Sequence, residues 1–286
     1  MTRRTVRLAH VLSSTALAAG ALLATAACAQ EDGREAGAAG ISASPAAARQ
    51  QTESPTGSPT GSPTGSPTGT LTESGAETAL ITAADIEDDW TQVKDTEAEN
   101  WHDGLLIGKV DVSDFLSAKT DAADCQRLMD SLFDDDLLGK PSGANALRGF
   151  TEGDSRLLYQ VAAYDRTDVQ DSLNWMAELP QECDQFTMTE NGEERTVQVT
   201  ESSLPSVGDA REGLRVTMRG PVDGTEATLT LDVAAVRVGD NAITVTAGGT
   251  DGDEDDSVRS AVQLGTQRLQ DVLAGKSPAA SPSQFD

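Results

Sequence analysis

The sequence predicts an α+β protein: an antiparallel sheet covered by helices on one side, in a single domain after a disordered tether. Two observations predict this class. Between residues 78 and 276, helix-like and strand-like segments do not alternate as strand–helix–strand units, which argues against a parallel sheet. The second half of this region consists mostly of strand-like segments joined by short turns, as in an antiparallel meander.

The first 27 residues have the pattern of a signal peptide for export. Arg3, Arg4 and Arg7 form a positive start, and residues 11–27 are apolar or small. This apolar run is short and rich in alanine and serine for a membrane-spanning helix. We therefore expect residues 1–27 to be a signal peptide of the lipoprotein type.

Cys28 follows two small residues, Ala26 and Ala27, as in a bacterial lipobox. In that motif the cysteine is diacylated and becomes the new N-terminus, which would hold the protein on the outer face of the cytoplasmic membrane. Thr25 stands where a strong lipobox has Leu, Val or Ile. Cleavage of an ordinary signal peptide, giving a secreted protein, is therefore the alternative.

Residues 28–77 are predicted to be a disordered tether. They contain four copies of the tetrapeptide SPTG from Ser54 to Gly69 and have no apolar face that could pack. A flexible chain of this length has a mean span of roughly 40 Å. Residues 277–286 have a similar composition and are predicted to be a disordered tail.

The chain has a formal net charge of −26. A surface this acidic repels nucleic acid and anionic lipid headgroups, so a nucleic-acid partner is not expected. Contact with a membrane is expected only through the lipid anchor.

The first half of the domain alternates between short helices and strands. A capping residue at Thr82 predicts an opening helix within residues 80–90. Apolar residues three and four apart predict a helix over 120–133, and Thr167 with Gln170 fits a capping box for a helix over 167–179 that ends before Pro180. Strands are predicted over 104–112, 146–152 and 156–165.

The second half is predicted to be an antiparallel meander closed by a helix. Asn191-Gly192 suits a two-residue hairpin between strands at 185–189 and 195–201. A final helix is predicted over 257–275, with Gly275 as its end signal. Three further strands are predicted over 213–220, 225–240 and 241–249.

Three cysteines are present, and lipidation of Cys28 would leave Cys125 and Cys183 as a pair. In an exported chain this pair predicts one disulfide, which would tie the second helix to the end of the third. A bridge over this separation contributes about 4 kcal/mol in the chain-entropy model.

No catalytic or metal-binding set is evident, so we expect neither an enzyme nor a bound cofactor. His102 is the one histidine after the signal peptide, and it is interpreted as a loop residue. Asp251, Asp253 and Asp255 match the start of a calcium loop, but Asp256 and Val262 stand where that loop needs Gly and Glu.

Two other groups of side chains are assigned to ordinary structural roles. Asp134, Asp135 and Asp136 are interpreted as a solvated helix end. Most aromatic residues are expected in the core, with a cleft lined by aromatics such as Trp101, Tyr164 or Trp175 as the alternative. An enzyme that uses carboxylates alone is the least favoured option.

The order of these elements resembles the PknH-like extracellular sensor domain of actinobacteria. The shared features are an opening helix with Asp and Trp, a helix with Cys125, the strand ending "VAAYD", a helix with Trp175, then Cys183 and a sheet-rich half closed by a long helix. The resemblance covers nearly all of residues 78–276. It implies an α+β domain with a cleft for an extracytoplasmic ligand, and it supplies no ligand-contacting residue.

These features together predict a membrane-anchored extracytoplasmic lipoprotein with a non-catalytic sensor domain that binds an unknown small ligand or an envelope protein. The alternative is a secreted or envelope structural protein without a small-molecule site.

Overall fold

The computed structural model describes residues 69–280, except for 87–88, 108–109, 112–119, 191, 223, 251 and 253. These residues lie in one compact unit, Gly61–Asp286. The predicted signal peptide, Cys28 and the tether up to residue 68 lie outside the described residues. None of the helices in the described part of the chain is long and apolar enough to cross a membrane.

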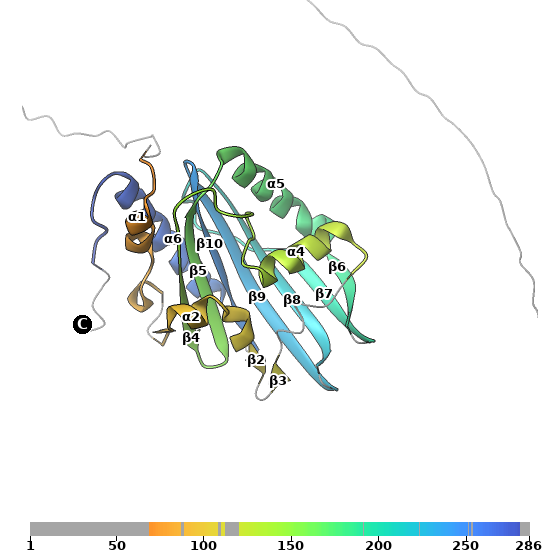
Figure 1. The fold of residues 1–286 in the computed structure, drawn as a ribbon. Helices are drawn as coiled ribbons and strands as arrows, with labels where there is room; N and C mark the ends of the chain where they lie inside the picture. The colour runs from red at the N-terminus through yellow and green to blue at the C-terminus, as the bar shows by residue number, and fades with distance from the viewer. Residues whose placement is uncertain are drawn as a thin grey trace, which may run out of the picture. The chain divides into compact units, whose positions relative to one another are not determined.

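An eight-stranded antiparallel sheet forms the centre of the fold (Figure 1), in the strand order β1-β4-β5-β10-β9-β8-β7-β6. A separate short pair consists of β2 (Leu106–Ile107) and β3 (Val110–Asp111). The strands of the large sheet are β1 (Thr91–Gln92), β4 (Asn145–Glu152), β5 (Ser155–Ala163), β6 (Gln185–Glu190), β7 (Glu193–Glu201), β8 (Ala210–Val222), β9 (Thr225–Val238) and β10 (Asn241–Gly249).

Helices cover both faces of this sheet (Figure 1). One face packs against α1 (Glu73–Ala79) and α6 (Asp255–Leu273), and the short turn η1 (Ala83–Asp85) lies beside α6. The other face carries α2 (Asp95–Ala98), η2 (Trp101–Gly104), α4 (Ala123–Phe133) and α5 (Arg166–Glu182).

The predicted α+β class is confirmed, but the prediction that helices cover only one side is wrong. Strand β9 explains the difference, because its neighbouring residues enter two separate cores. Leu231 and Val233 belong to the core shared with α4 and α5, whereas Ala234 and Val236 belong to the core shared with α6. A strand that is apolar at consecutive positions needs a cover on each face.

Packed structure begins at Leu71, ahead of the predicted start of the domain at residue 78. Leu71, Ala76 and Ala79 are buried, and the backbone N–H of Gly75 donates to Thr72 Oγ1 over 3.1 Å, which caps α1. The SPTG repeats end at Gly69, close to this cap. Helix α1 is short and has few apolar residues, so its sequence shows no clear helical periodicity. The tether ahead of this point stays a prediction.

The capping box predicted for the helix with Trp175 does not form. The helix begins at Arg166, one residue earlier, with Asp165 as N-cap and no side-chain capping bond. Gln170 instead donates to Asn174 Oδ1 over 2.9 Å. Pro180 lies inside the last turn of α5, which continues to Glu182 and is closed by the N–H of Cys183 bonded to Leu179 O.

Other local predictions agree with the structure. Thr82 caps the η1 turn through a capping box with Asp85. The β6–β7 hairpin pairs Glu190 with Glu193, which leaves the predicted two-residue loop, and Gly192 has a φ of +86° as that turn requires. Gly275 follows α6 with a φ of +71°, as expected of a helix end signal.

The structure joins Cys125 to Cys183, the pairing expected from the cysteine count. Their Cα atoms lie 5.6 Å apart, and both side chains are buried. The bridge connects the first turn of α4 to the residue after α5, within the core on their face of the sheet. The bridge therefore holds α4 against the end of α5.

Replacing both cysteines, Cys125→Ser with Cys183→Ser, should lower the free energy of unfolding by about 4 kcal/mol, because the unfolded chain gains the freedom of a loop whose ends are 58 residues apart. Denaturation with guanidinium chloride would measure this loss. A reducing agent should destabilise the wild type by a similar amount and leave the double variant unchanged. Equal stability of the oxidised wild type and the variant would contradict the prediction.

Candidate ligand-binding site

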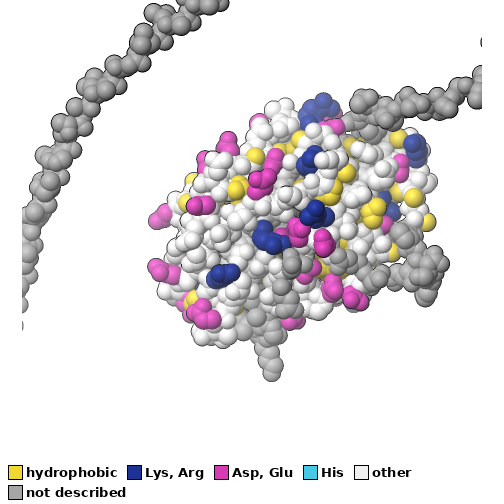
Figure 2. Space-filling model, turned by 180° about the vertical axis from the view of Figure 1, so that it is seen from behind, with side chains coloured by type: hydrophobic (Ala, Val, Ile, Leu, Met, Phe, Trp, Pro, Cys, Tyr) yellow, Lys and Arg dark blue, Asp and Glu magenta, His cyan; other side chains and the backbone are white. Residues whose placement is uncertain are grey.

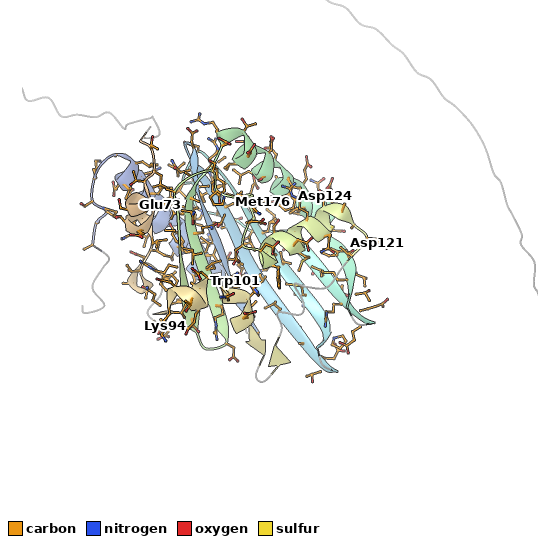
Figure 3. All side chains as sticks on the ribbon, in the orientation of Figure 1. Glu73, Lys94, Trp101, Asp121, Asp124 and Met176 are labelled. Carbon is orange, nitrogen blue, oxygen red and sulfur yellow. A yellow bond between two sulfur atoms is a disulfide. The ribbon has the colours of Figure 1, made fainter. Side chains whose placement is uncertain are left out.

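A cavity of about 380 Å³ lies between the α2–η2 segment and the β4–β5 hairpin. Figure 3 labels Trp101, which comes from η2 and forms part of its wall, and Lys94, the residue before α2. The full lining consists of Val93, Thr96, Glu97, Ala98, Asn100, Trp101, Asp103, Gly149, Phe150, Thr151, Arg156 and Leu157.

A close approach of α2 to the sheet forms the back of the cavity. Gly149 makes this approach possible, because a Cβ there would lie 2.8 Å from Val93 Cγ2 and 2.9 Å from Ala98 Cβ. The N–H of Val93 also donates to Gly149 O over 2.9 Å. A short helix is thus held directly on β4, and the space beside it stays open.

Buried apolar side chains of α2 and η2 form one wall of the cavity. Ala98 and Trp101 are 1% and 3% exposed and belong to the core shared with α4 and α5. Gly149 faces α2, so the side chains of Phe150 and its partner Leu157 point to the other face of the sheet, into the core shared with α6. An apolar wall with a few polar groups at its edge is typical of small-molecule sites.

Polar side chains surround the mouth. Thr96, Glu97, Asn100 and Asp103 are exposed and come from α2, η2 and the residues between them. Opposite them lies Arg156, whose Nη1 donates to Thr151 Oγ1 over 2.7 Å and to two carbonyl oxygens of the hairpin turn. One nitrogen of the guanidinium thus holds the hairpin turn.

The one polar group of Trp101 forms a hydrogen bond within the protein. Its indole Nε1–H donates to Asp135 Oδ1, in the turn after α4. Asp135 has a φ of +56°, a left-handed conformation that Asp tolerates better than most residues. The wall of the cavity is thus connected to α4, which the disulfide holds.

Burial raises the pKa of Asp135 from 3.8 to about 7, and the charges of Asp134 and Asp136 add to this rise, while the hydrogen bond from Trp101 opposes it. Burial and Asp134 also raise the pKa of Asp136. Three groups around Asp136, namely Lys140, Ser131 and Arg127, act in the opposite direction. The interpretation of residues 134–136 as a solvated helix end is therefore wrong for Asp135, because the side chain of Trp101 covers it.

His102 lies next to this wall and is half-buried. Its ring centroid is 4.4 Å from that of Phe133, and its Nε2 is 3.4 Å from Asp103 Oδ1. Among the described residues its buried Nδ1 has no hydrogen-bond partner. The ring packs against Phe133, and among the described residues no hydrogen bond joins it to a serine or cysteine.

Of the three aromatic residues considered for a cleft, only Trp101 lines the cavity. Tyr164 and Trp175 are buried against α4 and α5 instead. The Arg127 guanidinium lies 3.9 Å from the ring centroid of Trp175. Gly149 was missed as a residue of the site because its contact with α2 depends on strand order and on how the short helix lies on β4.

Two other hollows lie near the β7–β8 loop. One, of about 510 Å³, is lined by Ser202, Ser203 and their neighbours, and the other, of about 460 Å³, lies between this loop and α6. Both are lined mainly by hydroxyl, amide and charged residues and have no aromatic wall. The cavity beside Trp101 is therefore the strongest candidate for a small ligand.

The acidic loop before α6 is only partly covered by the described residues, because Asp251 and Asp253 lie outside them. Asp255 accepts hydrogen bonds from Ser202 Oγ and Arg259 Nη1. Within the part of the chain that the structure describes, no three His, Cys, Asp or Glu side chains gather as they would around a metal ion.

Comparison with known proteins assigns no function to the chain. No family model and no curated protein matches the chain. Among solved structures, the chain is similar to the extracellular domain of PknH from Mycobacterium tuberculosis, at 11% identity over 72% of this chain and 98% of that one, with a TM-score of 0.36. At this TM-score neither function nor site residues can be transferred, and membership of the PknH-like family stays a prediction.

The variant Asp135→Asn should change how stability depends on pH. In the wild type the folded state keeps this proton between about pH 4 and about pH 7, whereas the unfolded state loses it near pH 4. The stability that the protonated Asp135 contributes is therefore fully present below pH 4 and is lost as the pH rises through about 7. Asparagine keeps an acceptor for Trp101 and should abolish this loss.

Urea denaturation of both proteins at a series of pH values would measure the difference. Glu212 and Asp232, whose pKa values are also raised by burial, are common to both proteins and cancel in the comparison. A stability difference that stays constant from pH 4 to pH 8 would show that Asp135 does not titrate in this range.

Proposed function

We propose that this protein is a membrane-anchored extracytoplasmic lipoprotein whose domain binds a small ligand in the cavity beside Trp101. The observation that carries the proposal is a cavity of about 380 Å³ in which the buried side chains of Ala98 and Trp101 lie beside exposed polar residues. A concave site with apolar walls and a few polar groups at its edge is typical of small-molecule binding.

The chemistry of the mouth supports a binding role. Glu97 and Asp103 are exposed, so water screens their charges and nothing prepares them for proton transfer. Asp135, whose pKa is raised to about 7, is shielded from the cavity by the indole that it bonds. It would therefore position the wall and would not touch a ligand.

The placement outside the cell rests on the sequence and the disulfide. The signal-peptide pattern and Cys28 support export and lipid anchoring, and the tether would separate the domain from the membrane. A disulfide between Cys125 and Cys183 fits an oxidising compartment.

A ligand in this cavity should be lost when the mouth is blocked. Thr96 is exposed on α2 and lines the cavity, so Thr96→Trp places a large ring across the opening without disturbing the core. Thr187, exposed on β6 and outside the cavity, gives the matched control Thr187→Trp.

The measurement is native mass spectrometry of each protein after incubation with a small-molecule extract of the cells that produce it. Wild type and Thr187→Trp should retain the same bound molecule, and Thr96→Trp should lose it. If wild type retains nothing, or if all three proteins retain the same molecule, the cavity is not a ligand site.

Lipid anchoring is tested by the mass of the mature protein in its native membrane fraction. The wild type should begin at Cys28 and carry a diacylglyceryl group, and Cys28→Ser should be absent from membranes and lack that mass. A wild-type chain that is soluble and cleaved elsewhere would make the protein secreted and remove the anchor from the proposal.

A second candidate function is that of an envelope interaction protein. It is favoured by the exposed surface of β6 and β7 on the α6 side of the sheet. There α6 packs on β9 and β10 and leaves β6 and β7 exposed. Figure 2 views the molecule from behind and shows Lys, Arg, Asp and Glu side chains scattered over that face among uncharged atoms. The exposed residues on these two strands include Thr187, Thr189, Thr196, Gln198 and Thr200.

A further inference from the structure

We propose that strand β6, at one edge of the large sheet, docks an extended, positively charged peptide segment of another protein. The segment would add one more strand to the sheet through backbone hydrogen bonds. The proposal goes beyond ligand binding in the cavity, which lies beside β4 and β5, and does not depend on it. It gives the second candidate function a docking edge and a partner chemistry.

The first observation is the direction of the backbone groups of β6. The N–H of Val199 on β7 donates to Asp184 O, and the register of β6 and β7 continues this pairing without a bulge. Opposite residues of an antiparallel pair alternate between bonded and non-bonded. Phe186 is therefore bonded to β7, whereas Thr187 and Thr189 direct their N–H and C=O groups away from it.

These outward groups have no partner among the described residues. The strand order ends at β6, and within that part of the chain no hydrogen bond reaches the backbone of Thr187 or Thr189. Both residues are exposed. The N–H of Gln185, which also points outward, is bonded to Asp184 Oδ1 over 2.7 Å. The edge thus offers two donors and two acceptors, spaced as an added strand requires.

The second observation is that β6 lacks the usual protection of an edge strand. Natural sheets protect their edges with charged residues, proline, bulges or very short strands. The opposite edge, β1, is only Thr91–Gln92. Residues 185–189, by contrast, contain no charged residue, proline or glycine, and threonine and phenylalanine favour strands. β6 is therefore the edge that can pair with an incoming strand.

The two faces of β6 specify the side chains of that strand. Phe186 is half-buried and packs at the border of the core shared with α4 and α5. Thr187 and Thr189 lie on the opposite face and are exposed. Cross-strand neighbours on the same face interact, so alternate residues of the segment should be apolar beside Phe186 and polar beside the two threonines.

The third observation is the charge around β6, which defines the partner. The Cys125–Cys183 disulfide holds the first turn of α4 close to the start of β6, and Asp121 and Asp124 are exposed there. Figure 3 labels these two residues. At the other end, Glu194 is exposed beside the last residues of β6. Carboxylates at both ends attract a cationic segment, and the formal charge of −26 adds steering over longer distances.

The same charges oppose a second copy of this chain at the edge. Two β6 strands could pair antiparallel about Met188, which would satisfy the outward groups of Thr187 and Thr189. That pairing brings the acidic ends of both strands together, between chains that each carry a formal charge of −26. Repulsion of this kind prevents edge-to-edge association, so the edge favours a partner of opposite charge.

The test uses two synthetic peptides of alternating threonine and valine, one with paired lysines at each end and one with paired glutamates there. Isothermal titration calorimetry with the mature protein should show at least about fivefold tighter binding of the lysine peptide, a preference that shrinks as salt is added. A third peptide, the lysine peptide with N-methylated central amides, keeps the charge but cannot pair. It should bind at least about tenfold more weakly than the lysine peptide.

Hydrogen exchange followed by NMR locates the contact. The amides of Thr187 and Thr189 should exchange rapidly in the free protein, because they are exposed and unpaired. Saturation with the lysine peptide should slow both by at least about tenfold. The amide of Met188, which is bonded to β7, should change little.

The backbone contribution is isolated by Thr187→Pro with Thr189→Pro. These changes remove the two outward donors and no bond to β7, and edge strands tolerate proline at such positions. Binding of the lysine peptide should weaken by at least about tenfold. The matched control, Thr187→Val with Thr189→Val, keeps both N–H groups and should bind the lysine peptide as the wild type does.

Because two prolines can impair folding, a second variant tests the charges alone. Asp121→Asn with Asp124→Asn changes only exposed positions and should weaken binding of the lysine peptide by about twofold to fivefold. The matched control, Glu73→Gln with Glu77→Gln, removes the same charge from exposed positions on α1, which contacts β4, β5 and α6. It should leave the preference for the lysine peptide intact.

Several outcomes would overturn the proposal: no binding of the lysine peptide, equal binding of the glutamate or N-methylated peptide, or unchanged exchange at Thr187 and Thr189. If exchange at these amides slows when the protein concentration alone is raised, a second copy occupies the edge and the proposed partner is wrong. None of these results bears on the cavity, whose ligand is tested separately by Thr96→Trp.

Discussion

Burial of the central strands on both faces is the constraint on which the rest of the structure depends. β9 and β10 are buried at nearly every position, including Ala234, Val236 and Val245 toward α6 and Leu231 and Val233 toward α4 and α5. Neither layer of helices can be removed without exposing a row of these side chains. The disulfide fixes one layer, because it joins the two helices that cover the β7–β8 half of the sheet.

An ion pair between buried Asp232 and half-buried Arg215 lies where α6 begins. Asp232 on β9 is 1% exposed, and its two oxygens accept from Nε and Nη2 of Arg215 over 2.7 and 3.2 Å. The N–H of Glu254 also donates to it, over 3.2 Å, which places the start of α6 over β9. Burial still raises the pKa of Asp232, so the pair gives position to the helix more than stability.

The candidate site lies beside β4 and β5, where the short elements α2 and η2 cover the sheet in place of a long helix. Gly149 lets this short segment touch β4, and the hydrogen bond from Trp101 to Asp135 connects it to the turn after α4. A ligand in the cavity would therefore contact a wall supported by the disulfide-linked layer. The site combines a buried apolar wall of Ala98 and Trp101 with exposed polar residues.

The sequence by itself determined the α+β class, the Asn191-Gly192 hairpin, the end of α6 at Gly275 and the pairing of Cys125 with Cys183, because these depend on periodicity, turn chemistry and counting. Only the tertiary structure decided that helices cover both faces, that Asp135 is half-buried beside Trp101 and that Trp101 and Gly149 line one cavity. Periodicity identifies apolar positions, but it does not say which strands become neighbours. The position of a side chain relative to residues 34 or more places away follows from strand order, which no local pattern encodes.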